Sequence, residues 1–125
     1  MNICFDEGFR EFEINGGRTI RIKPGDFSLP KRMEALNEWA KSFEPGKTLD
    51  ELEESDREAR KQLDAVLGEG VSDIIFGDMN CMSYASGKPV FINFIEAFFP
   101  IIEAELNAEK EKSDANIKKY TSQVQ

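Results

Sequence analysis

The fold is organised around the segment Leu67-Gly68-Glu69-Gly70-Val71-Ser72-Asp73-Ile74-Ile75-Phe76-Gly77-Asp78. A long polar helix is expected to end here, because Gly68 or Gly70 can supply its left-handed C-terminal cap. Ser72 is expected to cap one short helical turn. The apolar run Ile74-Ile75-Phe76 should then insert into the core. The segment is therefore predicted to join two long helices through a short one.

An N-terminal β-hairpin is predicted upstream of this segment. Apolar and charged side chains alternate along residues 12–14 and 20–22. This period of two is typical of strands that expose one face to solvent. Asn15-Gly16-Gly17 lies between them and tolerates the positive φ of a tight turn. Ile3 and Phe5 are a candidate for a further strand. A two-stranded hairpin is marginal alone, so its apolar face must lie on helices.

Two amphipathic helices are expected next. The first begins at Ser28, the predicted N-cap, and carries apolar residues three and four apart as far as Phe43. Trp39 widens that apolar face, and we expect it to pack against the hairpin. Thr48 and Glu51 form a predicted capping box, which starts the polar helix that ends in the glycine segment.

The last helix is the most apolar element of the chain. Pro89 can start it, because its missing N–H costs nothing in the first turn. The residues that follow are apolar on nearly every side, which is typical of a central helix or of one shared with another subunit. Pro100 lies within this pattern and predicts a kink near Glu96. Residues 79–88, before this helix, show no clear period and are expected to form a loop.

These patterns predict one α+β domain over residues 1–106. Its N-terminal β-hairpin packs on a bundle of about four α-helices, of which the long C-terminal helix is central. Residues 107–125 are polar and are expected to form a helical extension or tail, which either frays or meets another chain.

Composition excludes several classes of function. The 125 residues carry a net charge of −8, so nucleic acid and anionic membrane are not expected partners. There is no apolar run long enough to span a membrane and no signal-peptide pattern, so we expect a cytoplasmic protein. Cys4 and Cys81 are the only cysteines and are expected to be free thiols.

The sequence predicts no catalytic, cofactor or metal site. It contains no histidine, which removes the commonest general base, the partner of a catalytic cysteine and the commonest neutral metal ligand. The glycine segment lacks the third glycine, the lysine and the preceding strand of a phosphate-binding loop. Residues 78–82 begin like a calcium loop, but the fifth position is methionine and no glycine follows. An enzyme is therefore not expected.

Binding to another protein is the alternative that composition leaves open. The last helix carries more apolar surface than a small domain readily buries from one side, although a purely structural core helix would explain the same residues equally well. On this basis the candidate protein-binding residues are the apolar side chains of the last helix, with acidic residues of the preceding polar helix as a charged rim: Phe91, Phe94, Ile95, Phe98, Phe99, Ile102, Glu53 and Glu54.

Three motifs together resemble a known family. They are the hairpin end Phe12 to Gly16, the segment Leu63 to Gly77, and the start of the last helix from Phe91 to Glu96. In this order they resemble the small tail assembly chaperones of long-tailed phages and prophages of Gram-positive bacteria. The resemblance covers about residues 9–106, and Leu63 to Phe76 is its most specific part.

The resemblance implies a non-enzymatic role in the cytoplasm of a bacterial host. Such chaperones bind the long helical tape-measure protein before tail assembly, keep its apolar segments soluble, and are displaced as the major tail protein polymerises. Self-association into a homo-oligomer is expected as well. Two other functions stay open: an acidic DNA mimic that inhibits a DNA-binding protein, and a structural connector of the phage head or tail.

Overall fold

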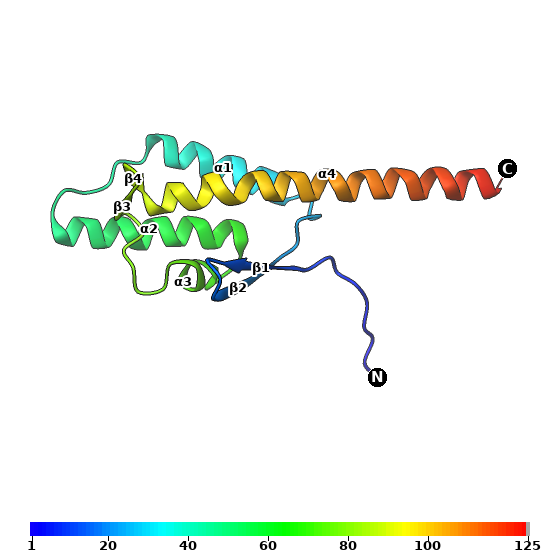
Figure 1. Cartoon of the computed structure of the whole chain (residues 1–125), viewed down its shortest axis with the longest axis horizontal. Coiled ribbons are helices and arrows are strands. Elements are labelled where there is room, and N and C mark those ends of the chain that lie inside the picture. The colour runs from blue at the N-terminus through cyan, green and yellow to red at the C-terminus, as the bar shows by residue number, and fades with distance from the viewer. Residues whose placement is uncertain (125) are drawn as a thin grey trace.

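A computed structural model describes the backbone of residues 1–124 and the side chains of residues 1–117. Figure 1 shows α1, α2 and α4 running along a common direction, with a β-hairpin and the short α3 on one side of them. The predicted α+β class is confirmed. The elements, in chain order, are β1 (Arg10–Ile14), β2 (Arg18–Ile22), α1 (Leu29–Ser42), α2 (Leu49–Leu67), α3 (Val71–Phe76), β3 (Tyr84–Ala85), β4 (Lys88–Pro89) and α4 (Val90–Val124).

The predicted N-terminal hairpin is present. Strands β1 and β2 pair antiparallel, with Phe12 opposite Ile20. The turn places Asn15 and Gly16 at φ values of 50° and 75°, in the left-handed region that these residue types tolerate. The further strand expected at Ile3 and Phe5 does not form: residues 1–9 have no strand partner, and the chain before Glu7 extends away from the domain (Figure 1).

Helix α1 begins as predicted but is capped differently. Ser28 occupies the N-cap position in a helical conformation, and its side chain makes no capping hydrogen bond. Its N–H and hydroxyl instead donate to Asp26 Oδ1, over 2.9 and 2.8 Å. Trp39 was expected on the hairpin, but it stacks on Phe43 and meets Phe91 edge-on.

The capping box of α2 is confirmed. Glu51 N–H donates to Thr48 Oγ1 over 3.2 Å, and Thr48 N–H donates back to Glu51 Oε2 over 3.2 Å. Gly46 lies just before this box. A Cβ at Gly46 would come within 2.9 Å of the Glu51 carbonyl carbon, so only glycine allows the loop to approach the helix so closely.

The glycine segment joins α2 to α3 as expected, but Ser72 does not cap α3. Gly70 is the left-handed N-cap residue, at φ 83°. The capping acceptor is Asp64, whose carboxylate receives Ser72 N–H over 2.8 Å and Gly70 N–H over 3.3 Å. Ser72 is buried, and its hydroxyl has no hydrogen-bond partner among the described residues. Ile75 and Phe76 enter the core as predicted, whereas Ile74 remains 42% exposed.

Helix α4 runs without a break through Pro100 (Figure 1). The predicted kink is not evident there. Pro100 and Glu96 both lie on the exposed side of the helix, where water can satisfy the Glu96 carbonyl that proline leaves unpaired. The helix then projects beyond the other elements, and almost all side chains from 107 to 117 are exposed. Before α4, the expected irregular loop contains the short antiparallel pair β3–β4.

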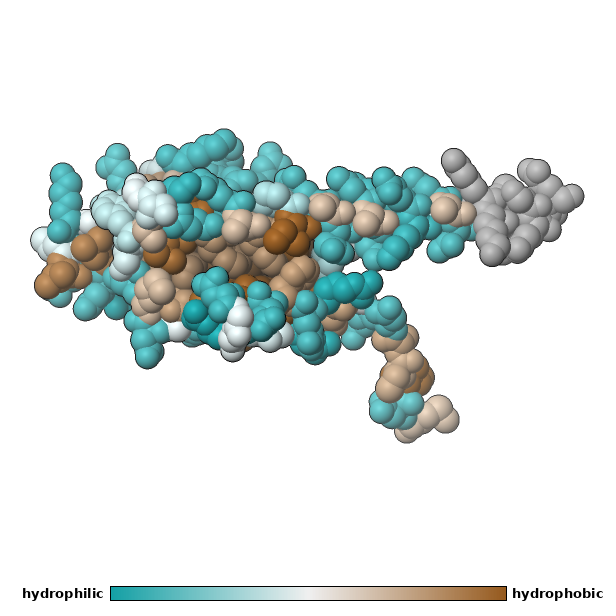
Figure 2. Space-filling model, viewed as in Figure 1, coloured by the Kyte–Doolittle hydropathy of each residue, from teal (hydrophilic) through white to brown (hydrophobic). Residues whose placement is uncertain are grey.

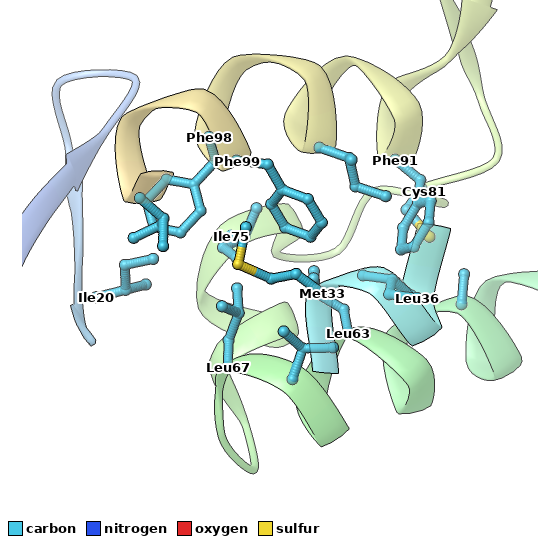
Figure 3. Close-up of a cluster of buried hydrophobic side chains, with 14 of the residues drawn as sticks. Ile20, Met33, Leu36, Leu63, Leu67, Ile75, Cys81, Phe91, Phe98 and Phe99 are labelled. Carbon is cyan, nitrogen blue, oxygen red and sulfur yellow. The ribbon is translucent and has the colours of Figure 1, made fainter. Parts of the chain in front are cut away.

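The core lies where α4 packs on the other helices and on the hairpin. Figure 3 shows side chains from all of these elements meeting in one cluster. Every long element therefore contributes to a single core. Its labelled members are Ile20 of β2, Met33 and Leu36 of α1, Leu63 and Leu67 of α2, Ile75 of α3, Cys81, and Phe91, Phe98 and Phe99 of α4.

Replacement of Ser72 by alanine should raise the free energy of unfolding by about 1 kcal/mol, because it removes a buried hydroxyl that has no partner. Replacement of Asp64 by alanine should lower it by about 1 kcal/mol, because two amides at the start of α3 lose their acceptor. Urea denaturation followed by circular dichroism measures both. If Ser72 capped the helix, Ser72→Ala would be the destabilising variant of the two.

Candidate functional site

Most of the apolar residues predicted to bind a partner are core residues. Phe91 and Ile102 are each 1% exposed, and the other buried members of the set are at most 7% exposed. They pack on the chain's own helices and hairpin and offer no free surface. The buried set is Phe91, Ile95, Phe98, Phe99 and Ile102. Phe94 alone is half-buried.

Phe94 lies in a groove beside the core. One face of α4 forms its floor, with lining residues three and four apart from Val90 to Ile101. Strand β1 and helix α3 form its walls, and its volume is about 330 Å³. Figure 2 shows this region as an apolar hollow between α4 and the hairpin. The lining residues are Val90, Asn93, Phe94, Ala97, Phe98 and Ile101 of α4; Phe12 to Asn15 and Arg18 of the hairpin; and Ile75, Phe76 and Met79.

Aromatic rings hold the floor of the groove in place. The Phe94 ring stacks on Phe98 with 5.1 Å between centroids, and it meets Phe76 edge-on at 6.0 Å. Phe12 of β1 packs edge-on against Phe98, with 5.2 Å between ring centroids. These are favourable aromatic geometries, and they fix the position of Phe94 without covering it. The groove therefore presents a preformed apolar surface.

The polar groups at the rim come from the hairpin and from α4. Arg18 extends across from β2 and donates to the Ile75 carbonyl over 2.8 Å. Asn93 donates to the Ala85 carbonyl over 2.9 Å. Glu13 is exposed beside the groove. The rim expected from Glu53 and Glu54 does not form here, because both are exposed on α2, which contributes no lining residue.

A polar cluster on α2 holds the wall of the groove in place. Arg60 is only 14% exposed and pairs with Asp56 over 3.1 Å and with Asp73 over 2.8 Å. Its guanidinium also donates to the Gly77 and Met79 carbonyls, at 2.8 and 2.5 Å. Arg60 thereby ties α3 and the following loop to α2. The sequence predicted no role for Arg60, because its partners Asp73, Gly77 and Met79 are 13 to 19 residues away and no local pattern links them.

The polar cluster around Arg60 lowers the pKa of the Asp56 carboxyl. Burial acts to raise the pKa of its carboxyl, but hydrogen bonds from Cys81 and the Arg60 guanidinium outweigh burial, so the pKa lies below the ordinary value. The Cys81 N–H donates to Asp56 Oδ1 over 2.8 Å. Burial and the neighbouring Asp56 carboxylate raise the pKa of the Cys81 thiol. Cys81 is therefore protonated and inert near neutral pH, whereas Cys4 is exposed, and neither is in a disulfide.

Within the part of the chain that the structure describes, no group of His, Cys, Asp and Glu side chains is placed to hold a metal ion. The same residues include no helix that is both long and apolar enough to cross a membrane. Comparisons with protein-family models, with curated proteins and with solved structures found no match to this chain.

Replacement of Arg60 by alanine should lower the free energy of unfolding by about 2 kcal/mol, because the half-buried Asp56 carboxylate loses its charged hydrogen-bond partner. Arg57, one turn earlier, is the matched control: its pair with Glu54 is exposed, so Arg57→Ala should leave stability unchanged within error. Chemical denaturation of both variants measures this. Equal effects of the two substitutions would show that the cluster does not hold α3.

The Asp56 cluster should also make stability depend on pH. Because the folded pKa of Asp56 is depressed, its contribution is complete above the unfolded value of about 3.9 and is lost as the pH falls through the folded pKa. The wild type should therefore exceed Asp56→Asn in free energy of unfolding at about pH 7, and the gap should narrow towards about pH 3. If the difference in free energy of unfolding between the wild type and Asp56→Asn stayed constant over that pH range, the pKa of Asp56 would not be depressed in the folded state.

Proposed function

We propose that this protein is a tail assembly chaperone of the phage and prophage type, and that its groove binds an apolar segment of the tape-measure protein. The observation that carries the proposal is the preformed apolar groove around Phe94, which remains open although the other five apolar candidates on α4 are buried. The three sequence motifs that resemble such chaperones support the same class. The sequence led us to expect an exposed apolar helix as the binding surface. In the proposal, the groove takes that role.

The dimensions of the groove suit a helical ligand. Its α4 floor runs from Val90 to Ile101, which is about 17 Å, or roughly three turns of helix. A partner helix with apolar residues at i, i+3 or i+4, and i+7 would place them along this floor. A long helical tape-measure protein has many apolar stripes of this kind, and covering them in the cytoplasm would prevent its aggregation. The net charge of −8 favours stripes flanked by basic residues.

Co-expression with the tape-measure protein of the same phage or prophage tests the proposal, because the partner should remain soluble and co-purify. Phe94→Asp should lower the yield of the complex at least tenfold, because it puts a charge on the apolar floor. Leu49→Asp is the matched control, since Leu49 is 81% exposed and lies outside the groove. Circular dichroism should show both variants folded. Phe98→Asp, at a site only 4% exposed, should unfold the chain instead.

Reversing the charge on α2 separates the chaperone from the DNA mimic. Glu53→Lys with Glu54→Lys should leave tape-measure binding intact, because α2 does not line the groove. A DNA mimic would lose its partner through the same change. Two further observations bear on the proposal: a tape-measure gene should lie directly downstream, and the protein should be absent from purified virions. Its presence in virions would favour a structural connector.

A further inference from the structure

The N-terminal arm, residues 1–9, is a second apolar surface that the domain does not cover. Ile3 is 76% exposed and Phe5 is 75% exposed, and Met1 is fully exposed. Figure 2 shows the arm as a chain of partly apolar side chains that extends into solvent away from the groove. Apolar surface of this kind is unfavourable in water unless another surface covers it.

The arm has the pattern of a strand. Met1, Ile3 and Phe5 occupy alternate positions, with Asn2, Cys4 and Asp6 between them. In an extended conformation the three apolar side chains share one face and the polar ones share the other. Such a segment needs two things from its binding site: a free strand edge and an apolar wall.

The groove supplies both. Strand β1 pairs only with β2, so the backbone groups along its other edge have no strand partner among the described residues. Residues Phe12 to Ile14 of β1 and Asn15 of the turn line the groove. Five extended residues span about 17 Å, which matches the length of the α4 floor from Val90 to Ile101. A strand added to β1 would place alternate side chains over Phe94.

The base of the arm points it away from the groove of its own chain. The Phe9 ring lies under two cations of the β2 side, 4.5 Å from the Arg21 guanidinium carbon and 4.7 Å from Lys23 Nζ. Glu7 pairs with Lys23 over 3.2 Å. These contacts hold Glu7 and Phe9 against the side chains of Arg21 and Lys23, neither of which lines the groove. The arm then leaves the domain at the end opposite the hairpin turn (Figure 1).

We infer that the N-terminal arm of one copy adds to strand β1 of a second copy and fills its groove, and that the exchange is reciprocal. Each arm buries on the order of 400 Å² through three large apolar side chains. Two arms and the two grooves they cover then bury on the order of 1,600 Å², the size of a standard stable interface. A twofold axis makes both contacts at once, so no unpaired arm remains to recruit further copies.

The exchanged arm would occupy the same groove as the proposed tape-measure segment. Arm exchange does not depend on the tape-measure protein being the partner. An arm in the groove would protect Phe94 until a tighter-binding segment displaces it. Arm exchange is measured with the purified chain alone, whereas the chaperone function needs the tape-measure protein. Each can therefore fail without the other.

Sedimentation velocity of the full chain at micromolar concentrations tests the exchange. The wild type should sediment as a dimer, and Phe5→Asp should raise the dimer dissociation constant at least tenfold. Phe27→Asp is the matched control, since Phe27 is 77% exposed but lies outside the arm and the groove. A monomeric wild type would overturn the inference, and so would a dimer that survives Phe5→Asp.

The cysteine of the arm reports where the arm lies. Cys4 is exposed, and Cys81 is buried and should not react. In an added strand Cys4 faces the same side as Glu13 of β1, so mild oxidation of Glu13→Cys should give a disulfide-linked dimer that disappears when Phe5→Asp is added. Glu54→Cys on α2 is the control and should give no more dimer than the wild type. A disulfide within one chain would show that the arm folds back instead, which contradicts exchange between copies.

Discussion

The burial of the apolar helix α4 is the constraint on which the rest of the structure depends. Phe91, Phe98 and Phe99 are each at most 5% exposed, and burying a phenylalanine contributes about 1.5 to 3 kcal/mol. No other element carries so much apolar surface, so the chain must arrange its shorter elements around this helix. Helices α1 and α2 cover one side of it and the hairpin covers another, while the face bearing Phe94 remains uncovered.

The uncovered face keeps its shape because polar contacts hold its wall. Helix α3 has only six residues, too few to be stable by itself. Asp64 caps its start, and Arg60 binds the carbonyls that follow it. Both residues belong to α2, so the polar helix α2 holds the short helix α3 in position. The charged residues of α2 thus form two sets. One set, which includes Arg60 and Asp64, supports the groove wall, whereas the other, which includes Glu53 and Glu54, is exposed to solvent.

The sequence predicted those features that are set by neighbouring residues. The hairpin at Asn15-Gly16-Gly17 and the capping box of Thr48 and Glu51 each depend on local backbone geometry, and both are present. Features set by distant residues were missed. Ser72 has the chemistry of a cap, but Asp64 reaches the same amides from the preceding helix. The groove was missed for the same reason: periodicity identifies α4 as apolar, yet it does not say which of its faces other elements cover.

The size of the chain explains why one apolar face stays open. A domain of about 100 residues buries only about two-thirds of its unfolded surface, and a helix apolar on nearly all sides needs neighbours on all of them. Here the chain has placed residues 107–124 in the extension of α4 and residues 1–9 in the arm, and neither covers the groove. Among the described residues, none therefore closes this side of α4, and both the proposed tape-measure contact and the proposed arm exchange are argued from that open groove. The open groove is thus a consequence of the whole fold, since it depends on which faces of α4 the other elements leave uncovered.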